Sequence, residues 1–253
     1  QRTWSSIIHH SEWVGLFRSL LAVSSREAVR FIAVSQPQAG AWLNAVPGQV
    51  AFKINTWAMR LLVQRRLGLP LTAVAARGAL SKHGREFDVM GDLATNDGAA
   101  GHQTRHHDVL VELVRRLRSV WGSAVEYEPA DSKDYSDTRP DLAVHTPMGL
   151  TLGDTKVFDD IGSDPASVGQ RGAHVGFGNT QPEADRIVLG RAARGQPGDG
   201  NFNAATGKGR VEPVKGAYQR PIASGMEVLV LLFSTFGGMS PGVVELVWRA
   251  AEE

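Results

Sequence analysis

The sequence predicts an α/β fold in which a mixed β-sheet with flanking helices is preceded by a small α-helical region. Three patterns carry this prediction: an amphipathic segment over 104–121, two short apolar runs around Pro147-Met148-Gly149, and an almost continuous apolar run over 226–233. The expected order is helix, strand, a hairpin of two strands, helix, strand and helix. Such alternation is typical of a sheet that helices cover.

The first part of the chain is expected to be helical. Apolar residues recur at helical spacing over 13–21 and 28–32, and Ser24-Ser25 supplies N-cap candidates between the two segments. A third helix is expected over about 54–67, and it should stop at Gly68. The arginines of this helix indicate either a solvated face or a surface that meets nucleic acid.

Composition and charge limit the possible classes of protein. The chain has 253 residues, 42% of them hydrophobic, and no cysteine, which excludes disulfides and thiolate zinc sites. Residues 1–87 carry 11 Lys and Arg against 3 Asp and Glu, whereas residues 88–253 carry 16 against 23. The basic part of the chain suits contact with a phosphate backbone, and the acidic part suits binding of a cation. The alternative interpretation is that the two parts simply have solvated surfaces of opposite charge.

The expected boundary separates an α-helical region over 1–80 from an α/β domain over 81–253. A long loop is expected at 158–210, where periodicity is weak and glycine is frequent. No run approaches the length of a bilayer-spanning helix. The first residue is Gln1, so we expect the chain to be a fragment of a longer protein.

Residues 104–121 form the most distinct predicted helix, with Thr104 as an N-cap candidate. One apolar stripe runs along it: Leu110, Leu113, Val114, Leu117, Val120 and Trp121. His106 lies four residues before Leu110 and therefore on the inward side, where packing against the core is one interpretation. Arg105, next to it, is a reasonable contact for a phosphate.

The hairpin around 147–149 places three charged residues together. Asp141 opens its first strand, and Asp154 and Lys156 lie two apart on its second strand, so they leave the same face of the sheet. Two carboxylates bind a hard divalent cation such as Mg²⁺, and a lysine beside them can position water and offset phosphate charge. The alternative interpretation is a hairpin in which Asp141 caps a turn and the Asp154–Lys156 pair is solvated.

Three further elements complete the prediction. Residues 125–129 alternate like a first strand, and Glu126 or Glu128 is a possible extra metal ligand. Lys215 lies three residues before Tyr218, so both occupy one face of a predicted helix; Lys215 is a phosphate candidate or part of an ordinary amphipathic turn. The run over 226–233 predicts a strand buried on both faces and central in the sheet, followed by a helix that begins at Ser240-Pro241.

The sequence Arg139-Pro140-Asp141, followed thirteen positions after Asp141 by Asp154-Thr155-Lys156, resembles the active-site pattern of the PD-(D/E)XK nuclease superfamily. The expected element order is similar to the αβββαβ restriction-endonuclease-like core of that superfamily. The resemblance implies a DNA endonuclease dependent on Mg²⁺ or Mn²⁺, with Asp141 and Asp154 as metal ligands. It also implies that Lys156 orients the attacking water and that His106 contacts the scissile phosphate or a catalytic water.

Other segments resemble the region that follows the polymerase domain in non-LTR-type retroelement proteins. They include residues 39–47, 65–71 and 234–246, and the resemblance covers most of 39–157 and 215–246. It implies an upstream reverse transcriptase in the same polypeptide, a nuclear location, and nicking of one target strand to prime reverse transcription. The implied partner is DNA or an RNA–DNA hybrid. The candidate nucleic-acid contacts are Arg105, Arg139 and Lys215.

The chain departs from that family in one respect, because the family carries cysteines that look like a zinc knuckle. A replacement site with nitrogen and oxygen ligands from His83, Asp88, His102 and His106 is one alternative, whereas Asp88 and Asp92 are better suited to turns or caps. Two other functions stay open. One is a catalytically inactive remnant that binds nucleic acid, and the other is a structural α/β domain.

Overall fold

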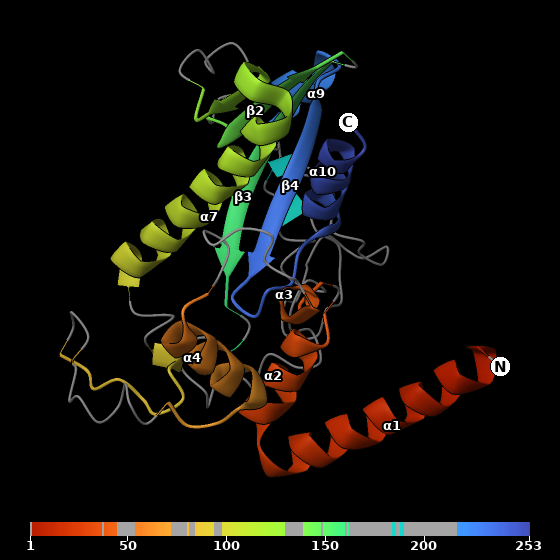
Figure 1. Cartoon of the computed structure of the whole chain (residues 1–253), viewed down its shortest axis with the longest axis vertical. Helices are drawn as coiled ribbons and strands as arrows, with labels where there is room; N and C mark the ends of the chain where they lie inside the picture. The colour runs from red at the N-terminus through yellow and green to blue at the C-terminus, as the bar shows by residue number, and fades with distance from the viewer. Residues whose placement is uncertain are drawn as a thin grey trace, which may run out of the picture. The chain divides into compact units, whose positions relative to one another are not determined.

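The computed structural model describes residues 2–36, 38–44, 54–71, 80, 84–93, 98–129, 139–147, 149–159, 161, 184–185, 188–189 and 217–253 (Figure 1). The chain forms two compact units. One contains Gln1–Gly101, Asp159–Val175 and Thr235–Gly238, and the other contains His102–Phe158, Gly176–Ser234 and Met239–Glu253. None of the helices in the described segments has both the length and the apolar character that crossing a membrane requires.

The described secondary structure of the first unit is mainly helical, as predicted. Its helices are α1 (Arg2–Val23), α2 (Ser25–Val34), α3 (Ala41–Asn44) and α4 (Thr56–Leu67). Ser24 is the N-cap of α2, and its hydroxyl accepts the backbone N–H of Glu27. Helix α4 ends at Gly68, whose φ of 69° is a left-handed conformation that favours glycine.

Asp88 and Asp92 have different roles in the first unit. The Asp88 carboxylate accepts the backbone N–H groups of Met90, Asp92 and Leu93 at 2.9, 3.1 and 2.6 Å, so its predicted role in a turn is confirmed. Asp92 instead binds the Arg26 guanidinium through both carboxylate oxygens. Burial raises the pKa of Asp92, while the hydrogen bonds and charge of Arg26 oppose that rise.

The second unit contains a four-stranded mixed sheet with flanking helices, which confirms the predicted mixed α/β fold for the described residues. Its strands are β1 (Val125–Tyr127), β2 (Leu142–Thr146), β3 (Gly149–Phe158) and β4 (Glu227–Ser234). They lie in the order β1-β2-β3-β4, antiparallel except for the parallel pair β3–β4. The predicted hairpin is β2–β3, in which Thr146 pairs with Gly149.

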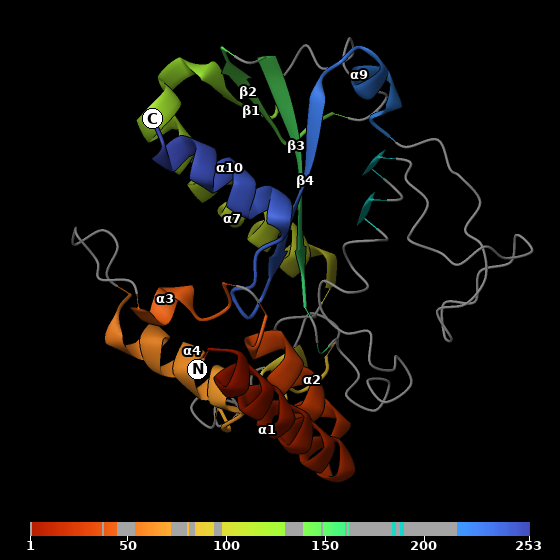
Figure 2. The same ribbon diagram turned by 90° about the vertical axis from the view of Figure 1, so that its right-hand side faces the viewer.

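Helices cover both faces of this sheet, as the edge-on view shows (Figure 2). Helices α7 (Gly98–Trp121) and α10 (Pro241–Ala251) lie on one face, where most of the predicted stripe of α7 packs against Leu142, Val144 and Leu231. Val120, which was also assigned to that stripe, is instead 44% exposed. Helix α9 (Gln219–Ala223) lies on the other face. There Tyr218, which immediately precedes α9, packs against Leu152.

Two predictions about these elements are wrong. Helix α7 begins at Gly98, so Thr104 lies inside the helix and is not its N-cap; the good helix formers Ala99 and Ala100 favour this earlier start. Strand β4 is the last strand of the described sheet rather than a central one. Its continuous apolar run reflects burial of both faces, which does not determine the strand's lateral position.

Candidate active site

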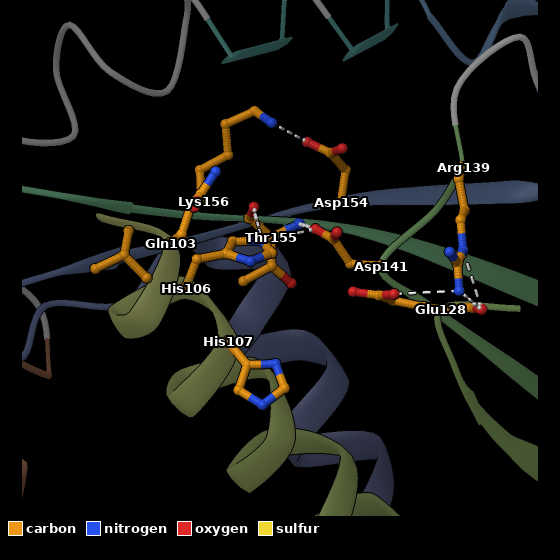
Figure 3. Close-up of a pocket in the computed structure, with 10 residues that line it drawn as sticks. Gln103, His106, His107, Glu128, Arg139, Asp141, Asp154, Thr155 and Lys156 are labelled. Atoms are coloured by element: carbon orange, nitrogen blue, oxygen red, sulfur yellow. Dashed lines mark hydrogen bonds and ion pairs between the residues drawn. The ribbon is translucent and has the colours of Figure 1, made fainter. Parts of the chain in front are cut away.

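A pocket of about 630 Å³ lies beside β3 in the second unit (Figure 3). Its wall includes His106 from α7, Asp141 from the segment before β2, and Asp154 and Lys156 from β3. Arg139 also lines the pocket. The fold therefore brings together all four residues predicted to be catalytic, from positions up to 50 residues apart along the chain.

Asp141 is held by hydrogen bonds at the start of β2. Its backbone N–H donates to the carbonyl of Gly153 at 3.0 Å, and its carbonyl accepts the N–H of Glu128 at 2.8 Å, so pairing with neighbouring strands continues at Asp141. Its Oδ2 accepts the N–H of Thr155 at 2.5 Å. Burial raises the pKa of Asp141, and the charge of Asp154 adds to the rise, while the Thr155 N–H and His106 oppose it.

Asp154 is buried, and its two carboxylate oxygens have different surroundings. Oδ1 lies 3.2 Å from the hydroxyl of Tyr218, which donates a hydrogen bond to it. Oδ2 lies 2.8 Å from Nζ of Lys156, in agreement with the predicted placement of both side chains on one face of β3. That contact is an ion pair and does not have hydrogen-bond geometry, so Oδ2 accepts no hydrogen bond from the described residues.

His106 lies beside Asp141 rather than being packed only against the core. Its Nε2 is 3.2 Å from Oδ2 of Asp141 and 3.0 Å from the carbonyl oxygen of Thr155. Both of these oxygens are acceptors, so we assign the ring hydrogen to Nε2. Its side chain is about one-third exposed, which leaves His106 accessible from the pocket.

Arg139 and Glu128 form a second charged group on the pocket wall. The guanidinium of Arg139 donates to the Glu128 carbonyl at 2.6 and 3.1 Å and lies 3.1 Å from the Glu128 carboxylate. Glu128 has a positive φ of 40°, which is uncommon outside glycine. Its carboxylate also accepts the hydroxyl of Tyr127 at 3.1 Å. Glu128, one of the two possible extra metal ligands, is thus engaged with Arg139 and Tyr127.

The other predicted residues either do not line this pocket or lie outside the described part of the chain. Arg105 is half-buried on α7 and is not among the residues that line it. Lys215 and His83 lie outside the described residues, as does the side chain of His102. The Glu126 carboxylate lies 3.0 Å from Nε2 of His145, and Glu126 does not line the pocket.

The sequence interpretation missed the contact between Tyr218 and Asp154. It considered Tyr218 only with Lys215, on the face of a predicted helix, whereas the structure places its ring in the core of the sheet. The two contacting residues are 64 positions apart. No periodic or local signal links positions so distant, and only the completed sheet brings them together.

The donor atoms of the pocket fit a hard divalent cation. Asp154 Oδ2 is buried and, among the described residues, contacts only the ammonium of Lys156 without hydrogen-bond geometry, and the negative charges of Asp154 and Asp141 interact. The Thr155 carbonyl, which shares the His106 N–H with Asp141, is a third oxygen donor nearby. No cluster of three or more His, Asp and Glu side chains suited to a metal is found within the described segments. Mg²⁺ needs fewer, because it retains waters and is usually bound by one or two carboxylates.

The fold and the pocket define a mixed α/β domain with two carboxylates, a lysine and a histidine at one site. The chain was also compared with protein-family models, curated proteins and solved structures. None of the three comparisons found a match.

Proposed function

We propose that this chain is a metal-dependent DNA endonuclease of the PD-(D/E)XK type. The observation that carries the proposal is the convergence of Asp141, Asp154, Lys156 and His106 in one pocket, where a buried oxygen of Asp154 lies 2.8 Å from the Lys156 ammonium. The αβββαβ order of α7, the four strands and the helix before β4 supports a restriction-endonuclease-like core. Carboxylates and a lysine at one site suit hydrolysis of a phosphodiester.

Each side chain has a distinct role in the proposed reaction. Asp141 and Asp154 hold Mg²⁺ or Mn²⁺, which when bound supplies a water of lowered pKa and a positive charge against the phosphate. Lys156 is nearly half exposed on a flexible stem, so its ammonium can leave Asp154 and orient the attacking water. His106 lines the same pocket, and its Nε2–H, which Asp141 and Thr155 share in this structure, can pass to a phosphate oxygen once the ring turns away from them.

The wider biological role rests on the resemblance to retroelement proteins. In that role the enzyme nicks one strand of target DNA, and the free 3′ end primes a reverse transcriptase in the same polypeptide, in the nucleus. Arg105, Arg139 and Lys215 are the proposed contacts to the DNA or to an RNA–DNA hybrid. Arg139 is engaged with Glu128 through Nε and Nη2, and its half-exposed guanidinium carries further N–H groups that can contact a phosphate.

Nicking of supercoiled plasmid in Mg²⁺ or Mn²⁺ tests the proposed function. We expect the wild-type chain to nick and Asp154→Asn to lose activity, because the amide removes a charged ligand but keeps the shape of the side chain. Asp108→Asn is the matched control: Asp108 is exposed on α7 and does not line the pocket. Undiminished nicking by Asp154→Asn would exclude this site. Salt-dependent DNA binding without cleavage in either metal would favour the inactive remnant.

A further inference from the structure

Tyr218 is the largest fully buried side chain among the described residues. A buried tyrosine hydroxyl normally has a hydrogen-bond partner, since an unpaired one is costly. Here the hydroxyl lies 3.2 Å from Oδ1 of Asp154 and 3.4 Å from the carbonyl oxygen of Arg139. Both partners are acceptors, so the phenol is the donor in these contacts.

The position of the Tyr218 ring is determined by the backbone and by the core. Its backbone N–H donates to the carbonyl of Val188 at 3.1 Å, and its carbonyl accepts the N–H of Ile222 at 3.2 Å. The ring itself packs in the cluster that contains Leu152 and Leu232. Because the backbone and the ring of Tyr218 are both fixed, its hydroxyl cannot move far if the carboxylate of Asp154 rotates.

The two oxygens of Asp154 are therefore not equivalent. Oδ1 accepts the Tyr218 hydroxyl. Oδ2 is the oxygen nearest the ammonium of Lys156, and Figure 3 shows this contact between Asp154 and Lys156. The terminal torsion of an aspartate is broad, so packing alone does not select one orientation of the carboxylate. A fixed donor at Oδ1 does select one.

We propose that Tyr218 is a positioning residue for the metal site, whose hydroxyl holds Oδ1 of Asp154 and so presents Oδ2 to the divalent cation. This inference rests on the proposed function, because the cation is the one that the nuclease would use. Tyr218 acts through Asp154 alone, as hydrogen-bond partners of metal ligands commonly do.

Tyr218→Phe tests the inference, because it removes the hydroxyl and keeps the ring that packs in the core. Isothermal calorimetry with Ca²⁺ alone should show an affinity about 10-fold or more below the wild-type value, within the range found for such partners. The rate of nicking in Mg²⁺ should fall with it. Incorporation of 4-aminophenylalanine in place of Tyr218 restores an N–H donor and should recover much of the Ca²⁺ affinity, which a purely packing role would not predict.

Tyr127→Phe is the matched control. It also removes one phenolic hydroxyl, but that hydroxyl contacts Glu128 and His107 rather than Asp154, so Ca²⁺ affinity should stay at the wild-type value. Unchanged Ca²⁺ affinity in Tyr218→Phe, with wild-type nicking intact, would overturn the positioning role alone. Weakened Ca²⁺ binding in Tyr218→Phe, with no nicking by the wild type, would support positioning and overturn the nuclease. A wild type that binds no Ca²⁺ would overturn both.

Discussion

Replacing Lys156 with alanine separates metal binding from catalysis in the proposed nuclease. The ammonium lies 2.8 Å from Oδ2 of Asp154, the oxygen that we assign to the metal. An ammonium has no lone pair with which to bind a metal, and it competes electrostatically with a cation for that oxygen. Lys156→Ala should therefore keep or raise metal affinity while it lowers the rate of cleavage.

The size of the affinity change follows from the exposure of the ion pair. At an effective dielectric constant of about 20, Coulomb's law gives roughly 6 kcal/mol for charges at this separation. The Lys156 side chain is 46% exposed, however, and exposed ion pairs contribute about 0.2–1 kcal/mol once solvent competes. Because 1.4 kcal/mol corresponds to tenfold in affinity, binding of Ca²⁺ should tighten by about fivefold at most.

The expected change in rate is larger than the change in affinity. Loss of one preorganised contact to the transition state typically lowers the rate by about 10²–10³-fold. Calorimetric titration with Ca²⁺, together with single-turnover nicking in Mg²⁺, measures the two effects separately. Lys156→Arg keeps a charge beside Asp154 and should leave Ca²⁺ affinity near the wild-type value. Loss of Ca²⁺ binding in a folded Lys156→Ala variant, or unchanged cleavage, would refute the role given to Lys156.

Three further predictions concern stability. Gly242→Ala should lower the unfolding temperature and destabilise the fold by about 1–3 kcal/mol, because the new Cβ would lie 2.7 Å from a carbonyl oxygen of β4. Gly15→Ala is the control: this helical position has nothing within 4 Å of the new Cβ, so the unfolding temperature should not fall. Asp92→Ala should lower the free energy of unfolding, measured by urea denaturation, by about 3 kcal/mol, because it leaves the Arg26 guanidinium buried without this partner. A hydrogen bond from Arg115 lowers the pKa of Glu112 from 4.5 to about 2. The ionised form of Glu112 therefore stabilises the fold above pH 4.5, and this stabilisation is lost as the pH falls toward 2. Glu112→Gln should have a free energy of unfolding lower than that of the wild type by under about 1 kcal/mol at neutral pH. At low pH the two proteins should unfold with equal free energies.

The hairpin was predictable because its determinants are local. Residues 147–149 form a break between two apolar runs, and the alternation of side chains in a strand then places Asp154 and Lys156 on one face. The position of Asp141 was also predictable, because it is the residue immediately before β2. Capping signals likewise predicted where α2 begins and where α4 ends, since Ser24 and Gly68 act on the backbone next to them.

Long-range arrangement was less predictable, for physical reasons that differ between elements. The apolar run of β4 reports burial of both faces, but hydrogen bonding to β3 on one side sets its place at the end of the described sheet. The start of α7 was not predicted because Gly98–Gln103 has weak helix propensity, with glycines at 98 and 101. His106 was assigned to the inward side of its helix, but its acceptors lie 35 and 49 positions away.

The pocket owes its chemistry to this combination of local and distant contacts. Strand alternation puts Asp154 and Lys156 on one face, but alternation does not decide which carboxylate oxygen faces the lysine. That choice depends on a hydroxyl 64 positions away, held by a backbone and a core formed from other segments. Asp141 is similarly aimed by the Thr155 N–H and by His106. A local motif can therefore place two carboxylates near each other, whereas the orientation that a metal ion requires depends on the completed sheet and the elements packed against its two faces.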